Sequence, residues 1–203
     1  MAISFYFYWN WIYSVWGWLY FILPVAAYIF LIIGCSELKK DERNFESVKF
    51  LSTIGIIVLT WSIISQFLPS VMFSYTFPDY FIGLSYYLTI MIINYSVNII
   101  LGIAFIKFGS KNKEHKGSLS LSAGILLTIA WASSLTFSIF IIFFGFPPVM
   151  YLTMQWIIGI LFLVAAILIL VNTILIKKVF MIIFAAIFLS YFTLNLLTIA
   201  NII

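Results

Sequence analysis

The side chains that could act as acids, bases or nucleophiles are few and unevenly placed. The chain of 203 residues holds ten Lys and Arg, six Asp and Glu, one His and one Cys. Half of the charged residues lie between positions 36 and 50, in the segment SELKKDERNFESVKF. Such a cluster could supply general acids and bases, a docking surface, or a solvated loop between two helices.

The spacing of these charges favours the solvated loop. Acids and bases three positions apart, such as Arg43 and Glu46, can neutralise one another in water. Asp41 or Asn44 can cap the helix that follows. We therefore interpret the segment as a hinge between two helices, and the alternative is a docking loop for a partner protein, formed by Glu42, Arg43 and Glu46.

Other kinds of reaction centre lack their essential residues. Cys35 and His115 are single residues in different segments, so no clustered set completes a tetrahedral metal site. The long apolar segments contain no His, Asp, Glu or Arg, and no Lys away from a boundary. This excludes a bis-His haem, a retinal Schiff base and a carboxylate proton relay. Because a nucleophile also needs a base beside it, we predict a chain that is not an enzyme, with no catalytic residues and no cofactor.

Composition places the chain in a membrane. It is 65% hydrophobic, 20% aromatic and 8% charged, with a mean hydropathy of +1.21, whereas soluble domains are about one-quarter charged. A membrane-spanning helix needs about 20 apolar residues. Six segments meet that length: 12–34, 50–72, 81–106, 119–143, 153–176 and 179–203.

These segments are too uniformly apolar for the strands of an outer-membrane barrel, which alternate apolar and polar residues. In lipid their backbone groups must be satisfied internally, so they should be helices. The predicted fold is therefore all-α, a single transmembrane domain over residues 1–203.

The basic residues predict the orientation of the chain. All ten lie in the first, third and fifth connections, and none lies in FSYTFPDYF (73–81) or FGFPPVMY (144–151). By the positive-inside rule the odd-numbered connections are cytoplasmic and both termini are external. We expect a multi-pass protein of the cell membrane whose partners are membrane lipids and other integral membrane subunits, not nucleic acid.

The N-terminal segment FYFYWNWIYSVWGWLY (5–20) has ten aromatic residues in sixteen positions. This density suits an aromatic belt at the membrane interface. The alternative is a surface for a partner or for lipid, formed by Trp9, Trp11, Trp16 and Trp18.

A shift of seventy residues aligns two parts of the chain without a gap, 50–107 with 120–177. It pairs Trp61 with Trp131 and Lys107 with Lys177. We interpret this as a duplicated helical hairpin, inserted twice in the same direction. The last and first spans would then form a third pair that completes a ring.

Neutral polar residues within the spans are candidates for interhelical hydrogen bonds or for the lining of a solute path. Asn94 and Asn98 are four apart and share a helix face. Trp61 and Trp131 are interpreted as core packing, with a ligand platform as the alternative. The remaining polar candidates are Gln66, Gln155 and Asn172.

Two segments, GCSELKKDERNF and LGIAFIKFGSKNKEHKGSLSLSAGILLTI, join apolar helix ends through short charged hinges. In this respect the chain resembles small multispanning membrane families of archaea. The resemblance implies no catalytic residues. Two hypotheses for function follow. The first is a non-catalytic subunit or scaffold of a larger membrane complex, such as a respiratory or transport complex. The second is a small channel or facilitator for an ion or a small neutral solute.

Overall fold

A computed structural model describes residues 15–40, 44–73, 80–112, 117–145 and 147–200. Every regular element in this part of the chain is an α-helix. In chain order the helices are α2 (Val15–Leu38), α3 (Phe45–Phe73), α4 (Tyr80–Lys111), α5 (Ser118–Phe144), α6 (Pro148–Ile176) and α7 (Val179–Ile199).

Local signals explain where several helices begin and end. Asn44 caps α3 as the sequence predicts, because its Oδ1 accepts the Ser47 backbone N–H at 2.9 Å. Pro148 occupies the first turn of α6, where its missing N–H costs nothing. Gly145, at the end of α5, has φ 67°, a backbone conformation that glycine adopts without strain.

The charged segment 36–50 is shorter as a loop than its sequence suggests. Helix α2 continues to Leu38 and α3 begins at Phe45. Glu46 therefore lies in the first turn of α3, where it is exposed and where an acidic side chain is favoured by the helix dipole. Glu42 and Arg43 lie outside the described residues, so the docking-loop hypothesis is not tested.

Five helices of the described chain are long and apolar enough to cross a membrane: Phe45–Ser65, Ser85–Lys111, Ser118–Phe144, Val149–Ile176 and Val179–Ile199. Helix α2 adds a shorter apolar helix over Ile22–Leu38. The prediction of an all-helical chain of membrane type is confirmed at this level, and the orientation of the loops stays a prediction.

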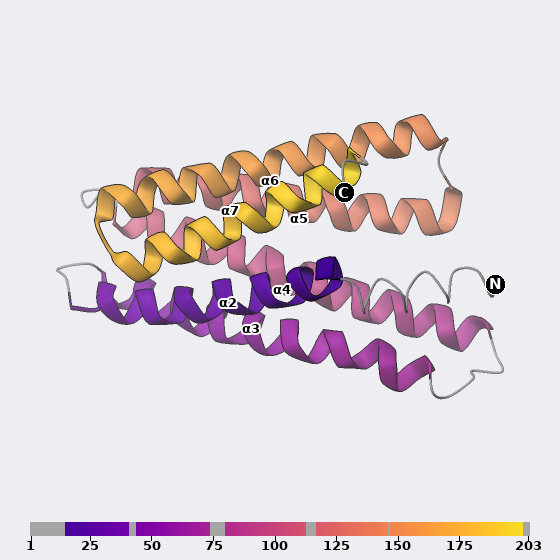
Figure 1. Cartoon of the computed structure of the whole chain (residues 1–203), viewed down its shortest axis with the longest axis horizontal. Coiled ribbons are helices and arrows are strands. Elements are labelled where there is room, and N and C mark those ends of the chain that lie inside the picture. Colours follow the sequence, from indigo (N-terminus) through magenta and orange to yellow (C-terminus); the bar gives the residue numbers. More distant parts are fainter. Residues whose placement is uncertain (1–14, 41–43, 74–79, 113–116, 146, 201–203) are drawn as a thin grey trace.

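The six described helices run side by side along the long axis of the molecule (Figure 1), and their contacts close them into a ring. Each helix packs against its neighbours in the chain, and α7 packs against α2. One end of the bundle holds the ends of α2, α4 and α6 and the beginnings of α3, α5 and α7, and described basic residues such as Lys49, Lys107 and Lys178 lie near it. We call the half of the bundle next to this end the basic half, and the half next to the opposite end, where α3 and α5 end and α4 and α6 begin, the non-basic half. The duplication itself stays a prediction.

Helices α4 and α5 make the closest backbone contact. A Cβ atom built on Gly124 would lie 2.5 Å from the Ile106 backbone nitrogen and 2.7 Å from the Gly102 carbonyl oxygen. Gly109 meets the backbones of Gly117 and Leu121 in the same way. Small residues allow this approach, and in lipid close packing is a main source of helix association.

Aromatic side chains fill the middle of the ring in the basic half. Phe184 and Phe188 lie one turn apart on α7, with ring centroids 5.3 Å apart. Across the ring, Phe105 of α4 stacks on Phe184 with centroids 6.1 Å apart. Phe105 and Phe184 are fully buried, as are Leu31 and Leu127. The interior of the basic half is therefore a packed core.

Candidate functional site

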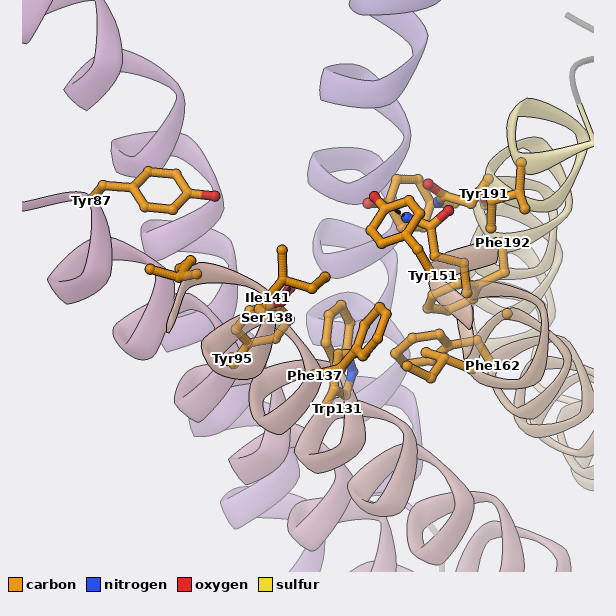
Figure 2. A pocket seen from close by; sticks show the side chains of 17 residues that line it. Tyr87, Tyr95, Trp131, Phe137, Ser138, Ile141, Tyr151, Phe162, Tyr191 and Phe192 are labelled. Atoms are coloured by element: carbon orange, nitrogen blue, oxygen red, sulfur yellow. Dashed lines mark hydrogen bonds between the residues drawn. The ribbon is translucent and has the colours of Figure 1, made fainter. Parts of the chain in front are cut away.

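A cavity of about 500 Å³ opens in the non-basic half, between α4, α5, α6 and α7 (Figure 2). Its size falls within the range of roughly 300–1,000 Å³ that is typical of small-molecule sites. We call it the aromatic pocket. Its lining is Tyr87, Tyr95, Trp131, Ser134, Phe137, Ser138, Ile141, Ile142, Tyr151, Gln155, Ile158, Gly159, Phe162, Tyr191, Phe192, Asn195 and Ile199.

The pocket ends near the middle of the bundle. Trp131 lies at the centre of α5, Phe162 at the centre of α6 and Tyr95 near the centre of α4. All other lining residues of these three helices lie toward the non-basic end. Below this level the core residues of the basic half are buried, so the pocket lies between the centre of the bundle and its non-basic end.

Aromatic rings build the deep end. Trp131 and Phe162 meet in a T-shaped contact with centroids 4.5 Å apart. Phe192 of α7 stacks on Phe162 at 4.6 Å. Higher up, Phe137 stacks on Tyr151 at 5.8 Å. In Figure 2 the side chains of Trp131, Phe137 and Phe162 point toward one another. The walls therefore offer flat apolar surfaces on which a ring can stack.

Hydroxyl and amide groups of the lining bond mainly to one another or to the backbone. The Tyr95 hydroxyl and Ser138 Oγ share a hydrogen bond of 2.9 Å. Ser134 Oγ donates to the Ala130 carbonyl at 2.8 Å, and the Gln155 amide donates to the Tyr151 hydroxyl. These bonds give most of the polar groups in the lining a partner within the chain.

Trp131 is an exception to this pattern. Its indole Nε1 is buried and has no hydrogen-bond partner. Two other buried polar atoms of the described chain, Glu37 Oε2 and Asn172 Oδ1, are also without partners, but neither residue lines the pocket. A buried donor without a partner costs about 1–3 kcal/mol, so the deep end of the pocket holds one unused donor.

The lining residues of the pocket carry no formal charge, since none is Asp, Glu, Lys, Arg or His. Transfer of a charged ligand into such a site would cost several kcal/mol because no counter-charge replaces its water. In the described part of the chain, no three His, Cys, Asp or Glu side chains gather as they would around a metal ion. The chemistry of the pocket is that of stacking and hydrogen bonding to a neutral molecule.

The structure separates the residues predicted as a polar lining. Gln155 lines the aromatic pocket. Asn94 accepts the Trp61 indole N–H at 3.2 Å, and Asn98 accepts the Tyr28 hydroxyl in a long hydrogen bond of 3.4 Å. These bonds join α4 to α3 and α2, so the two asparagines lie at helix contacts apart from the pocket.

Asn172 is buried between α6 and α5, where its amide donates to Ser120 Oγ. The side chains of Gln66, Trp16 and Trp18 and the whole of Trp9 and Trp11 lie outside the part of the chain that can be described. Their predicted roles stay predictions.

Sequence reasoning did not find the aromatic pocket. The sequence indicates core packing or a ligand platform for Trp131 and does not distinguish its neighbours Phe137, Phe162 and Phe192 from other aromatic residues. With 20% of all residues aromatic, an aromatic side chain in a span carries little information by itself. Phe184, Phe188 and Phe192 are four residues apart and share one helix face, and this spacing could have indicated an aromatic interior.

Comparison with family models, with curated proteins and with solved structures found no match to this chain. The fold and the site define its class: an all-helical bundle of membrane type with an uncharged aromatic pocket between four helices.

Proposed function

We propose that this chain is a non-catalytic membrane protein that binds a small uncharged molecule in the aromatic pocket, as a carrier or facilitator of that molecule would. The observation that carries the proposal is a cavity of about 500 Å³ whose lining is uncharged and rich in aromatic residues. Burial of apolar ligand surface provides affinity of roughly 25 cal/mol per Å² before the costs of ordering are subtracted.

The position of the pocket supports one direction of access. It reaches from the centre of the bundle to the non-basic side, and the core around Phe105 and Phe184 closes the other half. By the positive-inside rule the non-basic side is external. A ligand would therefore enter and leave from the outer leaflet or the outer solution.

A filled pocket tests the proposal. We expect the wild-type chain, purified in mild detergent from the membranes in which it is made, to retain an uncharged molecule detectable by native mass spectrometry. Ser134 is buried and lines the pocket, so Ser134→Phe should occupy the cavity and abolish retention.

The matched control is Ser190→Phe. Ser190 makes the same hydrogen bond to the carbonyl four residues before it, but it is exposed and does not line the pocket. Retention should survive this change. Equal retention by both variants, or none by the wild type, would count against the proposal.

A second candidate function, a subunit of a larger membrane complex, is favoured by the α5–α6 connection. Phe143, Phe144 and Val149 are 61%, 74% and 77% exposed there, on helices of 27 and 29 residues that exceed the length of about 20 needed to span the hydrocarbon. An exposed apolar tip where two such long helices meet is a surface that a partner could cover. The same purification should then yield a second protein in a fixed ratio to this chain, and Phe144→Ser should abolish its co-purification. Purification of this chain alone, as a monodisperse species, would exclude the role of a subunit.

A further inference from the structure

The unpaired indole N–H of Trp131, in the lining of the aromatic pocket, indicates which chemical group a ligand would carry. Trp131 Nε1 is buried without a hydrogen-bond partner. The rings of Phe162 and Tyr95 contact the Trp131 indole ring, with centroids 4.5 Å and 5.9 Å away. An aromatic face is at best a weak hydrogen-bond acceptor. A group with a lone pair would satisfy the indole far better.

Trp61, in the first hairpin, can be compared with Trp131. Seventy residues earlier, Trp61 occupies the same register in α3, and its indole N–H donates to Asn94 of the next helix at 3.2 Å. The position that corresponds to Asn94 in the second hairpin is Val164, which has no acceptor. At the aligned positions Trp61 therefore has a hydrogen-bond acceptor, Asn94, and Trp131 has none, because Val164 stands in its place.

The two tryptophans also differ in their surroundings. Trp61 does not line the aromatic pocket, whereas Trp131 does. In the first hairpin the indole makes a contact between helices, and in the second it belongs to a side chain that lines the deep end of a cavity large enough for a small molecule. An unmet donor at such a place costs stability until something from outside the chain bonds to it.

We propose that the ligand carries a neutral hydrogen-bond acceptor, such as a ketone, quinone, ester or amide carbonyl, and that Trp131 Nε1 donates to it at the deep end of the pocket. This inference rests on the proposed function and names the chemical class of its ligand. The apolar part of the ligand lies toward the non-basic side, against Phe137 and Tyr151. Charged acceptors are disfavoured because the pocket holds no cation.

Two probes of nearly equal shape test the inference. Benzophenone has a carbonyl between two phenyl rings, and diphenylmethane has a methylene group in its place. Radiolabelled benzophenone reacts with nearby C–H bonds under ultraviolet light, so its half-saturation is read from labelling of the protein in nanodiscs. Diphenylmethane is not photoreactive, and its dissociation constant is read from competition with that labelling.

The quantity of interest is the ratio of the two dissociation constants, because differences in lipid partitioning cancel when proteins are compared. In Trp131→Phe, which keeps an aromatic ring but has no N–H, the preference for benzophenone should fall about five-fold, the loss expected for one net hydrogen bond. In the control Trp61→Phe the ratio should not change.

The outcomes separate the two proposals. One result would overturn the acceptor inference and leave the proposed function standing. In it, labelling of the wild type saturates and is lost in Ser134→Phe, but Trp131→Phe does not change the ratio of the two dissociation constants. No saturable labelling at all would overturn both. If Trp131→Phe does not fold, the wild-type protein provides a second readout: of its seven tryptophans, one indole N–H resonance should move downfield with benzophenone and none with diphenylmethane. Movement with neither probe, despite saturable labelling, would also overturn the inference.

Discussion

Gly124→Ala is expected to lower the free energy of unfolding by at least about 2 kcal/mol, the cost of overpacking a close contact. The added methyl group would lie 2.5 Å from the Ile106 backbone nitrogen and 2.7 Å from the Gly102 carbonyl oxygen. Backbone atoms cannot rotate away as a side chain can. Helices α4 and α5 must therefore separate, and both line the aromatic pocket. Denaturation in mixed micelles, followed by circular dichroism, measures the loss.

Gly55→Ala is the matched control, since it adds the same methyl group to another helix contact. The nearest atoms there belong to the side chains of Leu31 and Ile32, at 3.3 Å and 3.4 Å. These side chains can move by a few tenths of an ångström, so we expect a change below about 1 kcal/mol. Equal losses for Gly55→Ala and Gly124→Ala would show that the α4–α5 contact is not as close as described.

Asn112→Leu is expected to lower the free energy of unfolding by about 2–3 kcal/mol. The Asn112 amide donates to Ser47 Oγ at 2.9 Å and to the Phe108 carbonyl at 2.8 Å. Its Oδ1 accepts the Asn44 backbone N–H at 2.9 Å. Asn112 is 1% exposed, so leucine would leave these partners without water to replace the lost bonds. The same denaturation experiment measures the effect.

The same substitution at Asn172 provides the comparison. Asn172 is also 1% exposed, but its amide bonds only to Ser120 and its Oδ1 has no partner. Leucine there removes an unsatisfied acceptor together with one hydrogen bond, so the net loss should stay below about 1 kcal/mol. A larger loss at Asn172 than at Asn112 would contradict this account of the hydrogen bonds.

The helices themselves were predictable because the membrane imposes one strong constraint. A backbone without water must bond to itself, so the long apolar segments had to be helical, and the cap at Asn44 follows from the residue type and its place before the apolar run. The sequence predicts an apolar span that begins at residue 50, and it does not indicate that α3 begins earlier, at Phe45. The charges of Glu46 and Lys49 marked the edge of the hydrocarbon, and a helix can continue beyond that edge into water.

The pocket was not predictable for the opposite reason. Helices that are apolar all round have no polar face to reveal their rotation, and rotation decides which of the many aromatic residues point inward. The glycine contact of α4 with α5 had a visible signal, since Gly102 and Gly109 on one helix and Gly117 and Gly124 near the other share a spacing of seven. That spacing does not by itself say which helix is the partner. The unpaired indole of Trp131 appears only when the neighbouring helix is placed beside it.

The location of bound benzophenone tests the central claim most directly. After photolabelling in nanodiscs and proteolysis, mass spectrometry identifies the residues that carry the probe. We predict saturable adducts on the pocket-lining parts of α5, α6 and α7, centred near Trp131 and Phe162, and their loss in Ser134→Phe but not in Ser190→Phe. Adducts spread over lipid-facing residues of both halves, with no difference between these two variants, would contradict the assignment of the aromatic pocket as a binding site.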